Sequence, residues 1–447
     1  MQCLINNGGK RVNRYLIVPG CSDLNRGDQA LVWETKRIAE ECGFIGEFYL
    51  TSEQNEPVIQ SETKGLKIVY PILEHPSRKF KSKENIKYTR TLKIKWGLVA
   101  FFDLLNSILI LANPTRKIVK KFSREEKIRA IEIMEQADAV FMKGGGLLQT
   151  YGGLASTYSM YFWVYPLLLA HKLGKPVYIM PNSFGPFEGP FVKKIAKLAL
   201  RKCKVVTTRE TFSQKMLEDQ LGISVRNYAD LAFELPKSNI DRNALYRKFD
   251  LPNDRKIVAL TMRPYRFPHS SNPEKAYLNF KHEMAEFIDW IYETGYMPVI
   301  VEHTLAVNAH ENDGACIRDV VAMIDKNRYR IISDSTYNCE DLKCVYSFFQ
   351  YIVGTRFHSM IFSFGSNVPG IAISYTGNKS TGIMHDMKLD DYVMDINDVT
   401  AENLKRKFVM LVNNEKKVRR KILNYRKFAA ESRVELKEKM KGEKGAL

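Results

Sequence analysis

The feature that most constrains the fold is a repeated alternation between short apolar runs and amphipathic stretches. The runs are bounded by Gly or Pro, and the stretches that follow have helical spacing, so the pattern predicts strands that each lead into a helix. Strands connected through helices pair in parallel, and the sequence therefore predicts an α/β fold. The predicted strands are RYLIVPG (14–20), ADAVFMKGGG (137–146), PVYIMPNSFGP (176–186), KVVTTRE (204–210), KIVALTMRP (256–264), MPVIVEHT (297–304), YRIISD (329–334), YIVGTRF (351–357) and VPGIAISY (368–375).

The alternation occurs in both halves of the chain and is interrupted by a polar segment at 233–256 that contains two prolines. A chain of 447 residues is long enough for two or three domains. We therefore predict two Rossmann-like domains that face a cleft, the first over residues 1–235 and the second over 253–400. In such folds, ligands bind beyond the carboxyl ends of the strands.

An insertion in the first domain, at about 75–125, departs from the alternation. A basic stretch leads into GLVAFFDLLNSILILA (97–112), sixteen mostly apolar residues that are followed by further cations. Two readings remain open: a helix that lies in a membrane interface with its lysines at the headgroups, or a buried helical insertion. No run of about 18 uncharged apolar residues occurs, so no transmembrane helix is predicted.

The formal charge of +18 is unevenly distributed. Residues 405–447 hold 15 Lys or Arg against five Asp or Glu, and residues 78–95 hold eight against one. Such segments suggest a polyanionic partner: nucleic acid, an anionic membrane surface or a phosphorylated substrate. Residues 401–447 are predicted to be a basic helical extension with either a solvated or a membrane-contacting face. No specific nucleic acid is predicted, because no RNA-binding or helix-turn-helix signature occurs.

Cysteine usage and the N-terminal sequence indicate the compartment. The seven cysteines are scattered, without a CxxC pair or a Cys/His cluster of zinc spacing. The first twenty residues lack the apolar segment of a secretory signal. We expect reduced thiols, no metal site and a cytoplasmic protein.

Two glycine-containing motifs follow predicted strands of the first domain. In NRGDQAL (25–31), Gly27 would allow the backbone to approach a ligand, and Asp28 is placed as the N-cap of a helix. In KGGGLLQT (143–150), Gly144, Gly145 and Gly146 predict a loop with exposed N–H groups, although neither a Walker A nor a dinucleotide spacing is present. Both motifs are candidate cleft loops, and a ligand-free turn is the alternative for each.

Three arginines follow strand ends, and one of them lies two residues before a histidine. TTRETFS (207–213) holds Arg209, TMRPY (261–265) holds Arg263, and GTRFHSMIFS (354–363) holds Arg356 and His358. Arginine at such a position can grip a phosphate or carboxylate with two N–H groups. His358 has the side chain whose ordinary pKa allows proton donation near neutrality. We predict that these residues converge on one cleft.

Two further segments are candidate site loops. SYTGNKSTG (374–382) places Lys379 in a glycine- and hydroxyl-rich loop that is suited to a phosphate, although a surface loop explains it nearly as well. VEHTLAVNAHENDG (301–314) gathers acidic residues and histidines without the spacing of a helical zinc motif. It is predicted to be a loop that contacts substrate rather than a metal site.

Taken in order, the motifs resemble the polysaccharide pyruvyl transferase family over residues 14–385. The segments that carry the resemblance are NRGDQA, KGGG, NSFGP, TRETFS, YADLAF, GTRFHS and VPGIAISYTGNKSTG. The resemblance implies a glycosyltransferase-B-like pair of domains and transfer of a pyruvyl group from phosphoenolpyruvate onto a sugar as a ketal, without a cofactor or an obligatory metal. It further implies that His358 is the general acid and that Arg356 and Arg209 bind the donor, while Gly27 and Gly144–Gly146 shape the acceptor side in the first domain. From the residues themselves we add Arg263 and Lys379 to the donor site. Members that act on lipid-linked glycans would work at the inner membrane face, which would give the insertion a purpose.

Two other functions compete with this interpretation. A nucleotide-sugar-dependent glycosyltransferase can use the same two-domain scaffold, because fold alone does not specify chemistry. Asp386 and Glu302 do not form a convincing carboxylate pair for a donor ribose, which favours pyruvyl transfer. A non-catalytic polyanion-binding protein is the second alternative, and it rests on the charge alone.

Overall fold

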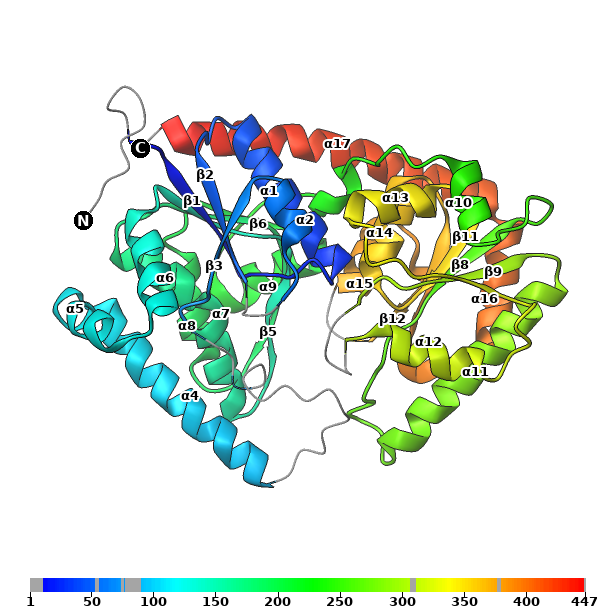
Figure 1. Ribbon diagram of the computed structural model, residues 1–447, viewed down its shortest axis with the longest axis horizontal. Coiled ribbons are helices and arrows are strands. Elements are labelled where there is room, and N and C mark those ends of the chain that lie inside the picture. The colour runs from blue at the N-terminus through cyan, green and yellow to red at the C-terminus, as the bar shows by residue number, and fades with distance from the viewer. Residues whose placement is uncertain are drawn as a thin grey trace.

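Two parallel β-sheets, each packed with helices, lie side by side in the molecule (Figure 1). The computed structural model describes residues 11–52, 56–73, 76, 90–305, 311–375 and 379–445. Every ladder within the described sheets is parallel. The predicted α/β fold of two Rossmann-like domains is therefore confirmed.

The first sheet has the strand order β3-β2-β1-β4-β6-β5, and β7 also pairs with β6. Its strands are β1 (Arg14–Val18), β2 (Glu47–Thr51), β3 (Leu66–Val69), β4 (Ala139–Met142), β5 (Gly145–Tyr151), β6 (Val177–Glu188) and β7 (Val205–Thr208). The helical elements of this half are α1 (Arg26–Glu41), α2 (Ile59–Thr63), α4 (Arg90–Leu111), α5 (Asn113–Phe122), α6 (Glu125–Gln136), α7 (Leu154–Lys172), α8 (Val192–Leu200), α9 (Thr211–Leu221) and the 3-10 turn η1 (Leu231–Glu234).

The second sheet has the order β10-β9-β8-β11-β12-β13, which is the 3-2-1-4-5-6 order of a Rossmann fold. Its strands are β8 (Ile257–Thr261), β9 (Met297–Val301), β10 (Arg330–Ile332), β11 (Tyr351–Gly354), β12 (Gly370–Ser374) and β13 (Val393–Asp395). Its helical elements are α10 (Arg242–Lys248), α11 (Pro273–Glu293), α12 (Asp313–Val321), α13 (Cys339–Ser347), α14 (Phe357–Gly365), α15 (Lys379–Asp386), η2 (Asp390–Tyr392), η3 (Ile396–Asp398), α16 (Ala401–Asn413) and α17 (Glu415–Gly445).

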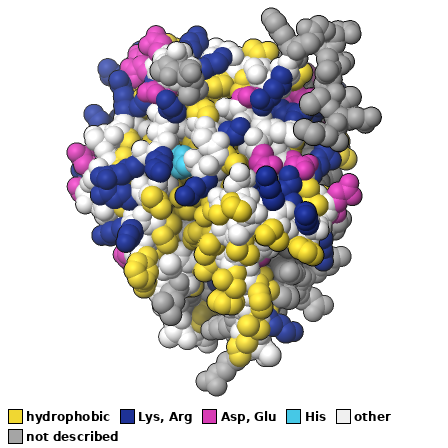
Figure 2. All heavy atoms as spheres, turned by 90° about the vertical axis from the view of Figure 1, so that its left-hand side faces the viewer, with side chains coloured by type: hydrophobic (Ala, Val, Ile, Leu, Met, Phe, Trp, Pro, Cys, Tyr) yellow, Lys and Arg dark blue, Asp and Glu magenta, His cyan; other side chains and the backbone are white. Residues whose placement is uncertain are grey.

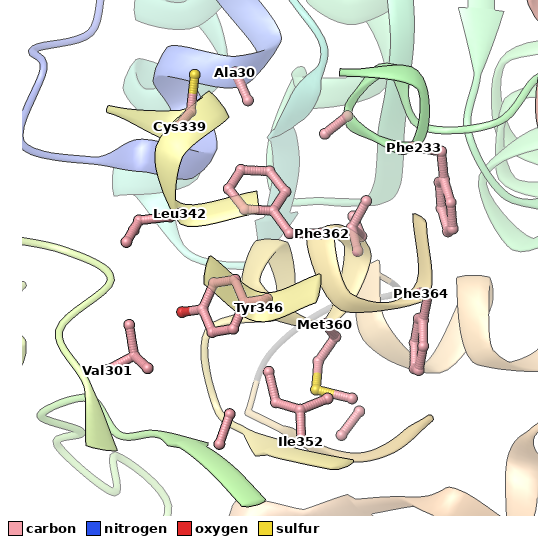
Figure 3. Close-up of a cluster of buried hydrophobic side chains, with 14 of the residues drawn as sticks. Ala30, Phe233, Val301, Cys339, Leu342, Tyr346, Ile352, Met360, Phe362 and Phe364 are labelled. Atoms are coloured by element: carbon pink, nitrogen blue, oxygen red, sulfur yellow. The ribbon is translucent and has the colours of Figure 1, made fainter. Parts of the chain in front are cut away.

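The contact between the two halves is apolar and continuous with the core. Figure 3 shows Ala30 of α1 and Phe233 of η1 beside side chains of α13 and α14, such as Leu342 and Phe362. At one edge of this contact, the buried Lys343 donates hydrogen bonds to three carbonyl groups in and after η1. The two domains are thus joined by a shared core as well as by the chain.

Helix α17 spans both halves along one side of the molecule (Figure 1). It buries an apolar row that includes Ile422 and Leu436, and its basic residues lie mostly outside that row. Near its C-terminus, Arg433 pairs with the buried Glu34 of α1 at 2.7 Å. The C-terminal extension is therefore helical, as predicted. It also packs against the first domain.

Several sequence-based expectations were wrong in detail. Gly145 and Gly146 begin strand β5 instead of a loop, because the 12-residue strand β6 extends past the end of β4 and β5 pairs with its second half. Strands β2, β3 and β13 were not predicted. The segment at 233–256 contains helix α10.

Helix α4 is longer than predicted, and it is not a buried insertion. Its window Ile94–Leu111 is long and apolar enough to cross a membrane by length and composition, yet only 11% of that window is buried. The basic residues at 77–89 lie outside the described residues.

Candidate active site

The switch points of the two sheets bring the predicted motifs together. In the second sheet, β8 and β11 are neighbours, and their carboxyl ends lead into Arg263 and into the segment with Arg356 and His358. In the first sheet, β1 and β4 are neighbours, and they lead towards Gly27 and into Lys143. Ligands in open α/β sheets bind at such points because the flanking loops diverge there.

His358 stands in the first turn of α14, against the opposite domain. The turn is fixed by Ser359, whose Oγ donates to the carbonyl of Arg356 at 2.6 Å and lies 2.9 Å from Thr261 Oγ1. A Cβ atom added to Gly27 would fall 2.3 Å from Nδ1 of His358. The imidazole therefore packs on the backbone of α1, where only glycine leaves room for it.

A buried carboxylate lies behind the imidazole. The Oδ2 atom of Asp230 is 4.0 Å from Nε2 of His358, and the Asp230 side chain is fully buried. Arg209 donates to the same Oδ2 from Nη1 at 2.5 Å and to Ser183 Oγ from Nε at 2.8 Å. An anion at this distance favours the protonated form of the imidazole. Arg209 is only 1% exposed. Its connection to His358 is therefore indirect and runs through Asp230.

Glu210, the next residue, is buried beside Arg209. Burial raises the pKa of its carboxyl to about 7, although Arg209 and hydrogen bonds from Ser183 and Ser213 oppose that rise. Across the domain boundary, a Cβ atom added to Gly382 of α15 would lie 2.4 Å from Glu210 Cγ. The carboxyl therefore changes charge near neutrality inside a close interdomain contact.

Arg356 is held by a second buried carboxylate. Its Nε and Nη2 atoms lie 2.8 and 2.7 Å from Oδ1 of Asp313, and Nη2 also donates to the carbonyl of Glu311. Burial lowers the pKa of the guanidinium, but Asp313, Tyr375 and Glu311 together outweigh burial and the net shift is upward. Burial raises the pKa of Asp313, while Arg356 and then Arg263 lower it. Arg263 lies near this pair, with its guanidinium 4.3 Å from the Tyr375 ring centroid.

His303, which follows β9, is a second imidazole in this region. Its Nδ1 atom lies 3.2 Å from the Tyr346 hydroxyl, and its Nε2 has no hydrogen-bond partner in the described part of the chain. Burial, followed by the positive charges of His358 and Arg356, lowers its pKa well below the usual value. This histidine is therefore neutral near pH 7.

The glycine-containing motifs meet through a different contact. Lys143 Nζ pairs with Asp28 Oδ1 at 2.5 Å, which joins the end of β4 to the first turn of α1. The N-cap of α1 is Asn25 instead of the predicted Asp28, because Asn25 Oδ1 accepts from the N–H groups of Gly27 and Asp28. A Cβ atom at Gly144 would lie 2.9 Å from the carbonyl oxygen of Pro181, so this glycine is required for packing between strands.

The structure thus gathers some predicted residues and separates others. Gly27, His358 and, through Asp230, Arg209 form one group, and Arg356 with Arg263 forms another beside it. Gly145 and Gly146 belong to a strand, and the side chain of Lys379 lies outside the described residues. Sequence reasoning missed Asp230 and Glu210 as site residues, and it included His303 and Asp313 only as members of the predicted substrate-contacting loop at 301–314. Asp230 lies in YADLAF, which carried the resemblance and was the available signal.

Within the described ranges, no three His, Cys, Asp or Glu side chains are grouped so that they could hold a metal ion. The chemistry that the described side chains can supply is anion binding by arginine and proton transfer by an imidazole.

Comparison with known proteins identifies relatives by sequence. Residues 25–377 match the family model of the polysaccharide pyruvyl transferases. The amylovoran biosynthesis protein AmsJ of Erwinia amylovora is 24% identical over 298 residues, which cover 65% of this chain and 69% of that protein.

Solved structures show the same arrangement of two domains at low identity. A glycosyltransferase from Rickettsia africae ESF-5 has a TM-score of 0.51 at 13% identity and covers 96% of this chain and 98% of its own. The S. aureus MnaA–UDP co-structure has a TM-score of 0.55 at 14% identity, with coverage of 92% and 90%. Arabidopsis thaliana UGT89C1 complexed with UDP-L-rhamnose has a TM-score of 0.53 at 10% identity, with coverage of 96% and 100%. These similarities establish the glycosyltransferase-B-like fold, and the fold alone.

Proposed function

Because the chain belongs to the polysaccharide pyruvyl transferase family, we propose that it transfers the pyruvyl group of phosphoenolpyruvate onto a sugar of a cell-surface polysaccharide or of its lipid-linked precursor, forming a ketal. The observation that carries the proposal is the position of His358, which lies against Gly27 of the other domain and within 4.0 Å of the buried Asp230.

Donor binding is assigned to the second domain. Phosphoenolpyruvate carries a phosphate and a carboxylate, and both are suited to guanidinium groups. Arg356 and Arg263 lie at the switch point of that sheet, and the N-terminus of α14 adds backbone N–H groups that favour an anion. Lys379 remains a proposed further contact.

His358 is the proposed proton donor. The C2=C3 double bond of phosphoenolpyruvate opens as its methylene carbon takes a proton from the imidazolium, while a sugar hydroxyl forms a bond to C2 and releases its own proton to water. A second hydroxyl then bonds to C2 and gives its proton to the neutral imidazole, phosphate leaves with the electrons of its C2–O bond, and the ketal closes. Asp230 stabilises the imidazolium. Because Arg209 is buried and paired with Asp230, we assign it a positioning role through that carboxylate.

The test measures binding of phosphoenolpyruvate and turnover separately. Calorimetry at moderate salt is expected to show saturable binding that weakens at least tenfold in Arg356→Ala, because its guanidinium is a proposed donor contact. Arg328→Ala is the control, since Arg328 pairs with Asp289 and Glu293 on the surface of the same domain. His358→Ala should keep donor affinity but lose about 10²–10⁴-fold in phosphate release with unpyruvylated oligosaccharides.

A different result would favour the competing function. If phosphoenolpyruvate does not bind the wild type and UDP does, a nucleotide-sugar-dependent glycosyltransferase replaces the pyruvyl transferase. Near-normal phosphate release by His358→Ala would remove His358 as the acid.

We also propose that the reaction takes place in the cytoplasm. All six cysteines among the described residues are free. Free, mostly buried thiols are typical of reducing compartments.

A further inference from the structure

Helix α4 presents an apolar stripe to the outside of the molecule. Seven large apolar side chains recur at helical spacing along it, and each is between 45% and 64% exposed. At 100° per residue they occupy a sector of about 120°. Figure 2 shows hydrophobic side chains gathered on this side of the molecule. The stripe consists of Ile94, Leu98, Phe101, Phe102, Leu105, Ile108 and Leu109.

Three polar residues in the second half of α4 face the protein instead. Ser107 is fully buried, and its Oγ lies 2.8 Å from the hydroxyl of Tyr161 in α7. Tyr165 of the same helix donates to the carbonyl of Ser107 at 3.2 Å. Asp103 and Asn106 are half-buried on this side. The inward side also holds the buried Ile110, so α4 has apolar residues on both sides, whereas a helix at a water-exposed surface keeps them on its inward side.

Helix α5 extends the exposed apolar surface and adds cations. Ile118 and Phe122, one turn apart, are 56% and 86% exposed. The exposed Lys117 and Lys121 lie in the neighbouring row. On the inward side, Arg116 and Lys120 pair with Glu135 and Glu132 of α6, which fixes the helix in this orientation.

We propose that α4 and α5 dock the protein onto an anionic lipid bilayer, with α4 lying along the interface. Its apolar stripe enters the boundary between headgroups and acyl chains, and Lys95, Lys117 and Lys121 contact anionic headgroups. The proposal rests on the geometry of these helices and does not depend on the reaction assigned above.

Two other arrangements fit these observations less well. A spanning helix would have lipid on every side, whereas α4 packs on α7 through Ser107 and is joined directly to α5. A second copy paired through α4 would bring cations together in either orientation, because Lys95 stands near one end and Lys117 and Lys121 follow the other. Anionic headgroups, in contrast, carry the charge opposite to that of the lysines near both ends of α4.

Vesicle flotation tests the docking. The wild type is expected to float with vesicles of phosphatidylcholine and phosphatidylglycerol at 3:1, and to bind pure phosphatidylcholine less. The variant Leu98→Glu, Phe102→Glu and Leu105→Glu should lose at least tenfold in partitioning. The matched control is Ile59→Glu, Leu278→Glu and Val409→Glu, which changes equally exposed apolar residues on other helices and should bind like the wild type.

A second pair of variants tests the electrostatic contribution to vesicle binding. Lys117→Glu with Lys121→Glu should weaken binding to the anionic vesicles about tenfold or more, because each basic residue near the surface contributes on the order of fivefold. Lys416→Glu with Lys417→Glu on α17 is the control, since these lysines are equally exposed. This pair keeps the test decisive if the triple variant does not fold.

Three results would overturn the proposal. One is equal flotation of the wild type and both α4–α5 variants. Another is resistance of the bound protein to carbonate at pH 11, which would indicate a spanning helix. The last is a dimer in light scattering that the triple variant converts to a monomer, without vesicle binding by the wild type.

Discussion

At the scale of single residues, the close approach of Gly27 to His358 leads to a direct test. A Cβ atom at Gly27 would lie 2.3 Å from Nδ1 and 2.5 Å from Cγ of the imidazole. Gly27→Ala should therefore displace the ring and lower kcat at least about tenfold, since small displacements of a catalytic group are costly. The measurements are turnover and Tm. Gly442→Ala is the control, because an added Cβ there meets nothing within 4 Å.

The comparison of Gly27→Ala with Gly442→Ala also defines the result that would contradict a functional Gly27–His358 contact. Gly442→Ala should keep normal turnover and gain up to about 1 kcal/mol of stability from helix propensity. Normal turnover in Gly27→Ala would mean that the imidazole does not need its observed position.

Glu210 predicts a pH dependence of stability. Its folded pKa of about 7 lies above the ordinary 4.5, so the folded state holds a proton that the unfolded state releases. The resulting stabilisation is complete below pH 4.5 and is lost as pH rises through 7. Its size is on the order of 1–3 kcal/mol. Relative to the Glu210→Gln variant, the wild type should lose Tm between pH 4.5 and 7.5. Parallel Tm curves for the two proteins would mean that the carboxyl is ionised throughout.

At the scale of the element, the start of α1 connects stability to the site. Asn25 Oδ1 accepts from the N–H groups of Gly27 and Asp28 at 3.1 and 3.3 Å. Asn25→Ala should cost about 0.5–2 kcal/mol in denaturant unfolding, and it should also lower kcat because the same turn carries Gly27. Asn272→Ala is the matched control, since Asn272 caps α11 through the N–H of Lys275. If both variants keep full turnover, the first turn of α1 does not position His358, the proposed acid.

At the scale of the whole molecule, the shared core predicts that the two domains unfold together. Buried apolar residues of both domains form one cluster, and α17 packs on both. Calorimetry should show one transition with equal calorimetric and van't Hoff enthalpies. Leu436→Ala on α17 should lower the free energy of unfolding by about 2–5 kcal/mol. Leu423→Ala, on the exposed side of the same helix, should change that free energy little. Two separated transitions would show that the domains are independent.

The sequence alone determined the fold class and identified Arg263, Arg356 and His358 as the candidate site residues of the second domain. Five-residue apolar runs such as Ile257–Thr261 can be satisfied only by burial on both faces, which requires a parallel sheet covered by helices. A glycine at a strand end followed by Arg356 and His358 already indicates anion binding and proton transfer. These features are local, because propensity and side-chain chemistry act within a few residues.

The tertiary structure alone decided which partners these groups have. Nothing near His358 in the chain identifies Gly27 or Asp230 as its neighbours, because those contacts arise only when the two domains pack. Gly145 and Gly146 of KGGG begin a strand because β6 is long enough to pair with it. The apolar α4 was compatible with a buried or an exposed helix, and the sequence left that open. Ser107 contacts Tyr161 and Tyr165 of α7 through its hydroxyl and its backbone carbonyl, and this contact turns the apolar stripe outward. Contacts between distant segments depend on packing geometry, which a local pattern does not encode.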